Sequence, residues 1–328
     1  MKFNFGGRLK REFPSQVMVD ITEVCNLACV HCTHPKFKKS HIYEKAMLDP
    51  ELNKKMVHEV ASYGLNKTLY IRYTSNGEPL VHPKSYEMIY YAVKNSKTKV
   101  TLTTNGTILD DTRIKKIMDT GLHMIDVSID AYENDTYKKI RVNGNLEVTK
   151  GNVLKLVKFK NQIKAKTKII VSFVEQNENR SEVEEFRIFW KKSGVDQVLI
   201  RSLHTNSGSN AENNFHDNSF NKEKKRRACL YPWERIILTA KGMLSFCPTD
   251  WYGKSIVNDY RTSTIKDTWS NLFYSDLRKQ HKTCNFKNNF CKECPDWANT
   301  SWPEDENKSY ADLVENLLYK NFNDTIKV

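Results

Sequence analysis

Asp20-Ile21-Thr22-Glu23-Val24-Cys25-Asn26-Leu27-Ala28-Cys29-Val30-His31-Cys32 is the stretch that decides the fold of this chain. Its three cysteines have the spacing C-x3-C-x2-C and follow an apolar run that predicts a strand. Three thiolates can hold three irons of a [4Fe-4S] cluster and leave the fourth iron open to another ligand. A structural zinc site that includes a neighbouring histidine is the alternative. The chain beyond this stretch favours the iron–sulfur interpretation.

Length and composition describe an ordinary globular protein. The chain has 328 residues, enough for about two domains, with 39% hydrophobic and 28% charged residues. The segment 1–16 has no apolar core of a signal peptide and no run is long enough to span a membrane, so we expect a cytoplasmic protein. The eight cysteines fall in two groups, 25–32 and 229–294, which in that compartment indicates metal binding or catalysis rather than disulfides.

The formal net charge of +13 has two explanations that we prefer to nucleic-acid binding. The positive residues are scattered lysines with one short run at 224–227, and no stacking-aromatic motif of an RNA-binding module is present. A lysine-rich surface is the first explanation, and an anionic substrate is the second.

Strand and helix patterns alternate along the first two thirds of the chain. The predicted strands are 17–21, 68–73, 100–104, 124–130, 168–174 and 197–202, and the predicted helices are 48–63, one from about 83, 111–120, 148–161 and 183–192. This alternation predicts parallel βαβ units, and six units make an incomplete barrel rather than a closed eightfold one. Active sites of such folds lie at the carboxyl ends of the strands, where the marked polar residues and Cys25 fall.

The cysteine triplet and the later sequence Asn76-Gly77-Glu78-Pro79 resemble the signatures of the radical S-adenosylmethionine (radical SAM) enzymes. The resemblance implies an α/β core at 15–203 that forms a partial (β/α)6 barrel. It also implies a [4Fe-4S] cluster held by Cys25, Cys29 and Cys32, whose fourth iron is chelated by SAM.

Further positions match places that contact SAM in that family. Asn76-Gly77-Glu78-Pro79 resembles a Gly-Gly-Glu-Pro motif that binds the SAM amino group, although Asn76 replaces a glycine and an ordinary turn is the alternative. Asp130 either approaches SAM or caps the next helix. The SAM contacts implied by the resemblance are His31, Asn76, Gly77, Glu78, Pro79, Thr104, Asn105, Ser128, Asp130 and Arg141.

The second cysteine group follows a polar stretch at 204–228 that predicts a linker or loop. Its order resembles the SPASM or twitch extension of radical SAM enzymes, which implies a domain at 229–300 with an auxiliary [4Fe-4S] cluster. The implied ligands are Cys229, Cys247, Cys291 and Cys294, with a zinc ribbon as the alternative. Four ligands leave no open iron, which suits electron transfer.

Cys284 remains outside this set. It is a spare buried cysteine, a replacement ligand or a hydrogen-atom donor to a substrate radical, in that order of preference. In the last segment, 301–328, apolar residues at helical spacing over 309–322 predict a helix packed on the main body.

The family resemblance implies a chain with two [4Fe-4S] clusters and SAM that generates a 5′-deoxyadenosyl radical, with an electron donor such as flavodoxin or ferredoxin. Related short enzymes act on sugars and aminocyclitols, so we expect oxidation or epimerisation of a small molecule such as a sugar, aminocyclitol or nucleotide-sugar. The short segment before Cys25 supports this over the alternative, modification of a peptide or protein side chain. A GTP cyclase is disfavoured by the C-terminal sequence, and a non-catalytic zinc protein that binds RNA is the hypothesis from a different class.

Overall fold

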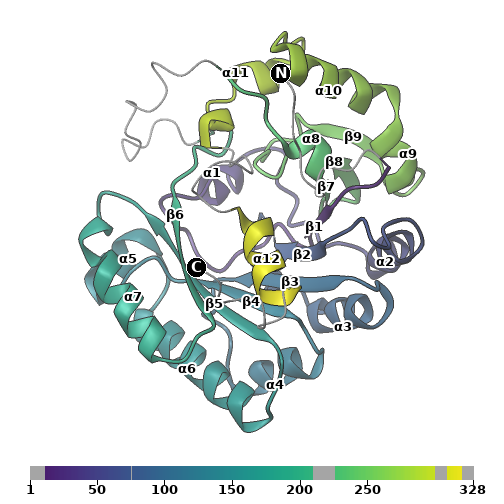
Figure 1. The fold of residues 1–328 in the computed structure, drawn as a ribbon. Helices are drawn as coiled ribbons and strands as arrows, with labels where there is room; N and C mark the ends of the chain where they lie inside the picture. The colour runs from purple at the N-terminus through teal and green to yellow at the C-terminus, as the bar shows by residue number, and fades with distance from the viewer. Residues whose placement is uncertain (1–11, 75, 210–225, 300–308, 320–328) are drawn as a thin grey trace, which may run out of the picture.

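The computed structural model describes residues 12–74, 76–209, 226–299 and 309–319, and Figure 1 shows their arrangement. Nine strands form one sheet in this part of the chain, in the order β6-β5-β4-β3-β2-β1-β7-β8-β9. The strands are β1 (Gln16–Asp20), β2 (Tyr70–Thr74), β3 (Lys99–Thr104), β4 (Met124–Ser128), β5 (Lys168–Glu175), β6 (Gln197–Ser202), β7 (Arg235–Leu238), β8 (Met243–Ser245) and β9 (Ile256–Asp259).

The helices and 3-10 turns connect the strands and extend past them. In chain order they are α1 (His34–Phe37), α2 (Pro50–Tyr63), η1 (Pro79–Val81), α3 (Ser85–Asn95), α4 (Asp111–Asp119), α5 (Asn134–Ile140), α6 (Leu146–Gln162), η2 (Arg180–Glu182), α7 (Val183–Lys192), α8 (Tyr231–Glu234), α9 (Ile265–Ser270), α10 (Leu272–Thr283), α11 (Asn289–Glu293), η4 (Asp296–Asn299) and α12 (Tyr310–Leu318).

Strands β1 to β6 pair in parallel, as the alternation predicts, and the sheet does not close. Side chains alternate between its two faces. Outward residues such as Ile71, Ile125 and Val171 are fully buried in the main core, which helices such as α2, α3, α4 and α6 complete on the outer side of the curved sheet (Figure 1). The prediction of a partial barrel is confirmed.

Helix α12 lies on the inner side of the sheet (Figure 1). Its Ala311 and Val314 pack against Tyr70, Met124 and Ile170, which point inward near the beginnings of β2, β4 and β5. The predicted C-terminal helix is therefore present, and it covers the lower part of the inner sheet face rather than the outside of the barrel.

The C-terminal extension continues the same sheet. Strand β7 pairs in parallel with β1, from Gln16↔Arg235 to Val19↔Leu238, and β8 and β9 add antiparallel strands beyond it. The sequence between Cys247 and the last cysteine pair predicts one helix over 265–281, and this prediction is wrong as a single element. The segment divides into α9 and α10 at Asn271, which has extended backbone angles and accepts a hydrogen bond from the Tyr274 amide as an N-cap.

Two further differences concern short segments. Helix α5 and strand β9 were not among the predicted elements, because each is short and lacks a clear apolar period. Residues 205–209, which fall in the predicted linker, are held by side-chain hydrogen bonds, while 210–225 lie outside the described residues.

Candidate active site

The loop with the first three cysteines follows β1 and is anchored by backbone hydrogen bonds. The Ala28 amide donates to the Val142 carbonyl at 3.0 Å and the Val30 amide to the Ile140 carbonyl at 3.0 Å, which tie the loop to the end of α5. Within the loop the Cys32 amide donates to the Cys29 carbonyl at 3.1 Å. The loop geometry is therefore fixed by the protein before any metal binds.

The three thiols converge in a poorly solvated place. Burial, with smaller contributions from neighbouring negative charge, raises the pKa of Cys25 to about 11 and that of Cys32 to about 12. At neutral pH the metal-free thiols are therefore protonated, and ligation has to displace the protons. Three neighbouring thiols, Cys29 buried and Cys25 and Cys32 half-buried, fit the ligand set of an iron–sulfur cluster.

Gly77 brings the second loop against the cysteine loop. A Cβ atom at this position would lie 2.2 Å from the Val24 carbonyl oxygen, so no other residue fits without movement. The next amide, of Glu78, donates to the same Val24 oxygen at 2.8 Å. Asn76 is half-buried and Pro79 buried at the beginning of η1. The predicted motif thus lies beside Cys25.

Glu78 organises the ends of β2 and β3. Its buried carboxylate accepts hydrogen bonds from the Leu80 amide at 3.1 Å, the Thr104 hydroxyl at 2.6 Å and the Asn105 amide at 2.7 Å. Asn105 in turn donates to the Asn26 side chain at 2.9 Å, inside the cysteine loop. Oε1 accepts the bonds from Leu80 and Thr104, and Oε2 accepts only the bond from Asn105, so Oε2 keeps one lone pair for an ammonium ligand.

Asp130, Arg141 and His31 form a buried charged group next to the cysteines. Asp130 has a left-handed backbone, φ 64°, and its Oδ1 accepts from the Val174 amide at 2.7 Å, while its other oxygen pairs with Arg141. Arg141 Nη1 lies 3.7 Å from Cys29 Sγ, and His31 Nε2 lies 3.5 Å from Asp130. Burial lowers the pKa of His31 to about 4 although Asp130 opposes this, so the imidazole is neutral.

The N-cap of α5 is Glu133, so Asp130 does not cap that helix, and its predicted contact with SAM stays a prediction. Arg141 is buried. Ser128 lies at the end of β4 with its hydroxyl 3.4 Å from that of Ser172.

A polar layer lies on the inner sheet face between α12 and the cysteine loop. Asp126 of β4 pairs with Arg201 of β6 at 2.5 Å and with Arg72 of β2 at 3.7 Å. Arg72 also donates to Thr103 and stacks on the Tyr310 ring of α12, 3.6 Å from its centroid. Arg201 keeps 29% of its side chain exposed. Two guanidinium groups thus share one carboxylate.

The second cysteine group lines one small cavity. Cys229, Cys247, Cys291 and Cys294 face it, together with the hydroxyl-bearing Ser207 and Thr249 and aromatic residues. Burial raises the pKa of Cys247 to about 11 and raises that of Cys291 and Cys294 as well. Four thiols around one cavity fit the predicted auxiliary cluster.

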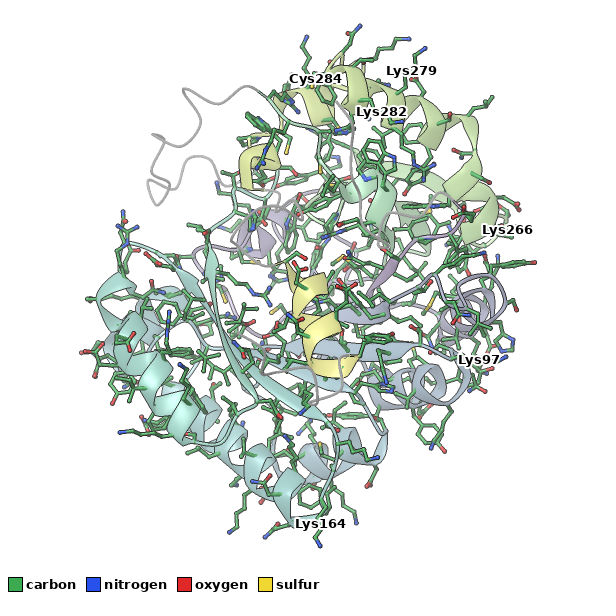
Figure 2. All side chains as sticks on the ribbon, in the orientation of Figure 1. Lys97, Lys164, Lys266, Lys279, Lys282 and Cys284 are labelled. Carbon is green, nitrogen blue, oxygen red and sulfur yellow. The ribbon has the colours of Figure 1, made fainter. Side chains whose placement is uncertain are left out.

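Cys284 does not line this cavity. It caps α10 in a left-handed conformation, φ 52°, and lies at the molecular surface (Figure 2). Its Sγ is 3.6 Å from the Arg226 carbonyl oxygen and 3.8 Å from that of His281. The expectation that a spare Cys284 is buried is wrong, because the cap leaves the side chain on the outside.

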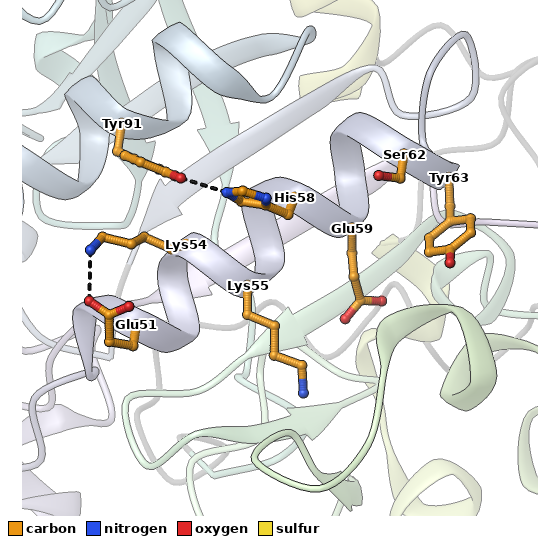
Figure 3. A pocket seen from close by; sticks show the side chains of 8 residues that line it. All are labelled: Glu51, Lys54, Lys55, His58, Glu59, Ser62, Tyr63 and Tyr91. Atoms are coloured by element: carbon orange, nitrogen blue, oxygen red, sulfur yellow. Dashed lines mark hydrogen bonds and ion pairs between the residues drawn. The ribbon is translucent and has the colours of Figure 1, made fainter.

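A groove on the outer side of α2 is a joint between parts of the chain rather than a reaction site (Figure 3). Glu51 pairs with Lys54, and His58 bonds Tyr91. Lys55 donates to the Tyr260 and Ser263 carbonyls, and Glu59 accepts from the Tyr260 hydroxyl and the Ile265 amide. These polar groups of the groove are paired within the protein, and the groove lies away from the carboxyl ends of the strands.

Sequence reasoning missed several residues of the site. Arg72, Asp126 and Arg201 alternate with outward apolar residues in their strands, so the period-2 pattern was a usable signal. Asp20, the last residue of β1, is 9% exposed and was missed because it belongs to none of the recognised motifs. Ser207, Thr249 and Asp296 come together only through the tertiary fold.

Two negative findings concern the described residues. No three His, Cys, Asp or Glu side chains there are arranged to hold a single metal ion. None of the helices in the same residues is both long and apolar enough to cross a membrane.

Known proteins share both parts of this arrangement. The sequence profile of an iron-sulfur cluster-binding domain, SPASM, matches residues 229–295. A tungsten-containing aldehyde ferredoxin oxidoreductase cofactor-modifying protein of Pyrococcus furiosus is 29% identical over 188 residues, 56% of this chain and 50% of that protein. A probable GTP 3′,8-cyclase of Methanococcus maripaludis is 34% identical over 152 residues, 46% of this chain and 47% of the relative. The chain thus spans about half the length of these relatives.

Solved structures show the same fold. Streptococcus suis SuiB bound to precursor peptide SuiA has a TM-score of 0.65 at 13% identity, covering 94% of this chain and 74% of SuiB. BtrN in complex with AdoMet and 2-DOIA has a TM-score of 0.54 at 16% identity, covering 86% and 91%. The profile of the Radical SAM superfamily matches residues 19–187, more than half of the sequence, and the chain belongs to that superfamily.

Proposed function

We propose that this radical SAM enzyme removes a hydrogen atom from a small polar molecule, such as a sugar, aminocyclitol or nucleotide-sugar, and thereby oxidises or epimerises it. The observation that supports this most is the polar layer of Arg72, Asp126 and Arg201 on the inner sheet face. This layer lies below the cysteine loop and above α12, and Arg201 remains partly exposed. It suits a polar substrate, and its excess of guanidinium groups suits an anionic one.

The residues of the site have two proposed roles: cysteines that bind the clusters, and residues that bind and orient SAM. Cys25, Cys29 and Cys32 would hold the first cluster, and Cys229, Cys247, Cys291 and Cys294 would hold the second. When bound, the clusters and SAM would supply an electron and a 5′-deoxyadenosyl radical for hydrogen-atom abstraction. The SAM contacts that we propose are His31, Asn76, Gly77, Glu78, Pro79, Thr104, Asn105, Ser128, Asp130 and Arg141.

Charge favours particular roles for some of these residues. Glu78 offers carboxylate lone pairs to an ammonium group while it fixes Thr104 and Asn105. Arg141, held by Asp130 beside Cys29, offers a cation to a carboxylate. A flavodoxin or ferredoxin is the electron donor that we propose.

Modification of a peptide side chain is the second candidate. It is favoured by the structural similarity to SuiB, which was solved with its precursor peptide. The similarity to BtrN, solved with 2-DOIA, supports the first candidate in the same way. Both likenesses are below 25% identity, so the choice depends on experiment.

The test is anaerobic reconstitution followed by assay of SAM cleavage with dithionite. We expect about eight irons and eight sulfides per chain, the content of two cubane clusters. The triple variant Cys25→Ala, Cys29→Ala, Cys32→Ala should release no 5′-deoxyadenosine, while Cys284→Ala, the matched surface cysteine, should release as much as the parent. Undiminished release from the triple variant would refute the radical mechanism, and about four irons with stoichiometric zinc would refute the second cluster.

The substrate class is tested by coupling. A substrate accelerates release of 5′-deoxyadenosine above the rate with SAM alone. In step with that release it loses two hydrogens if it is oxidised, or takes up one deuterium from deuterated water if it is epimerised. Screening anionic sugars and aminocyclitols against short peptides separates the two candidates. Coupled turnover only with peptides would overturn the small-molecule proposal.

A further inference from the structure

The segment 205–208, directly after β6, has an unusual backbone. Asn206 and Ser207 have φ values of 52° and 56°, and Gly208 has 91°, so three successive residues are left-handed. This conformation is unfavourable for residues with a Cβ atom and persists only where surrounding contacts hold it. The segment therefore needs a specific tether.

Asp296 provides that tether. Its Oδ1 accepts hydrogen bonds from the Thr205 amide and the Thr205 hydroxyl, both at 2.8 Å. Its Oδ2 accepts from the Ser207 amide at 2.7 Å. Because Asp296 comes two residues after Cys294, the position of Ser207 is tied to the segment that carries one of the four cysteines.

The tether places a chain of hydroxyl groups on a sulfur atom. The Ser207 hydroxyl is hydrogen-bonded to that of Thr249, and Thr249 Oγ1 lies 3.2 Å from Cys247 Sγ. Ser207 Oγ itself lies 3.8 Å from the same sulfur. A metal-bound thiolate sulfur has no proton, so it can only accept. Because Thr249 Oγ1 is the nearer of the two hydroxyls to Cys247 Sγ, we assign the direction Ser207 to Thr249 to Cys247, in which each bond polarises the next.

The other side of the segment faces the first cysteine loop. Asn206 Nδ2 lies 3.5 Å from the His31 carbonyl oxygen, between Cys29 and Cys32 in the sequence. Four consecutive residues thus contact both cysteine sets.

We propose that Thr249 and Ser207 donate a hydroxyl relay to Cys247 Sγ that raises the reduction potential of the auxiliary cluster, and that Asp296 is the positioning residue for this relay. Reduction adds negative charge to the cluster and its sulfurs, so a donor stabilises the reduced form more than the oxidised form. The inference rests on the second cysteine set holding an iron–sulfur cluster, and it is independent of the substrate.

The experiment is an EPR-monitored redox titration of the reconstituted full chain. In the Cys25→Ala, Cys29→Ala, Cys32→Ala background only the second cluster gives a signal. We expect Thr249→Val to change the ratio of reduced to oxidised cluster at a given potential by about fivefold toward the oxidised form. For a one-electron couple this is a fall of about 40 mV in midpoint potential.

Three variants separate the relay from a general packing effect. Thr249→Ser keeps the hydroxyl and should restore the parent potential. Ser202→Ala, at an exposed serine at the end of β6, should leave the potential unchanged. Ser207→Ala and Asp296→Asn should each lower it by less than Thr249→Val, and their double variant should fall no further than Ser207→Ala, because both act on one donor.

The results that would overturn the hydroxyl relay differ from those that would overturn the proposed function. A triple background chain without iron and sulfide would refute the second cluster itself, and the inference with it. A chain that holds about four irons but whose potential is the same in Thr249→Val as in the parent overturns the relay alone. An equal shift in Ser202→Ala, or no restoration in Thr249→Ser, overturns it as well.

Discussion

Replacing Asp20 with asparagine should make the protein more stable at alkaline pH. Asp20 ends β1 on the inner side of the sheet, where burial raises its pKa from 3.8 to about 8 and the charge of Glu23 adds to this. In the unfolded chain the carboxyl has its ordinary pKa. Asparagine has the same shape as the protonated acid but cannot ionise. The difference in unfolding free energy between variant and parent therefore measures the cost of keeping this carboxyl protonated in the folded state.

The direction of the pH effect on stability follows from the number of protons that the folded and unfolded chains bind. Below about pH 4 the carboxyl is protonated in both states and contributes nothing. Between about pH 4 and 8 the unfolded chain has released a proton that the folded chain keeps, so stability falls as pH rises, by about 1.4 kcal/mol per pH unit. Above pH 8 the cost stays constant. The Asn variant should therefore gain about 4 kcal/mol relative to the parent between pH 5 and pH 8.

The measurement is anaerobic urea unfolding of the metal-free, reduced chain at pH 5, 6.5 and 8. Asp196→Asn is a control of opposite sign. Although burial raises its pKa, bonds from the Ile169 amide and from Lys160 and Lys168 lower it more. That variant should lose stability at neutral pH, and the loss should disappear as the pH falls through the folded pKa. Parallel pH curves for Asp20→Asn and the parent would refute the reasoning.

Three further predictions concern single positions. Gly77→Ala should abolish most 5′-deoxyadenosine release, because its Cβ would lie 2.2 Å from the Val24 oxygen. Gly151→Ala, whose Cβ would have no neighbour within 4 Å, should retain full release, and equal activity of the two variants would contradict the close approach. Glu59→Gln should destabilise the joint to α9 by about 1–3 kcal/mol, measured by thermal unfolding, because its carboxylate accepts from the Tyr260 hydroxyl and the Ile265 amide. Cys284→Ala should leave substrate turnover intact. If the parent incorporates solvent deuterium at the reacting carbon and this variant does not, the reaction is not an oxidation and Cys284 is the hydrogen-atom donor.

Local signals predicted most of the barrel. The expected helix over 111–120 is α4, 111–119, because Asp110 caps it and its apolar residues recur at the helical period. The division at Asn271 was also a local signal, since asparagine is a preferred N-cap residue, but the apolar pattern across it concealed the break.

The rest depends on contacts between residues far apart in the sequence. The pairing of β1 with β7 joins residues about 220 positions apart, and no local pattern specifies it. The same holds for the charged layer, where Asp126 meets Arg72 and Arg201 only because their strands lie in one sheet. The spacing of the cysteines is a local signal, so their two groups could be predicted as metal ligands from the sequence, whereas the residues that hold them in place are subject to no such spacing.

The pairing of β1 with β7 also explains how the two cysteine sets keep their relative position. Cys25 follows β1 after a short loop, and Cys247 comes two residues after the end of β8, which is paired with β7. Cys25 and Cys247 therefore follow two strands that both pair with β7 in one hydrogen-bonded sheet. The bonds of Glu59 to Tyr260 and Ile265 add a second connection, and the segment 205–208 adds a third. These contacts tie the two cysteine sets to one another through the sheet and through side chains packed around it.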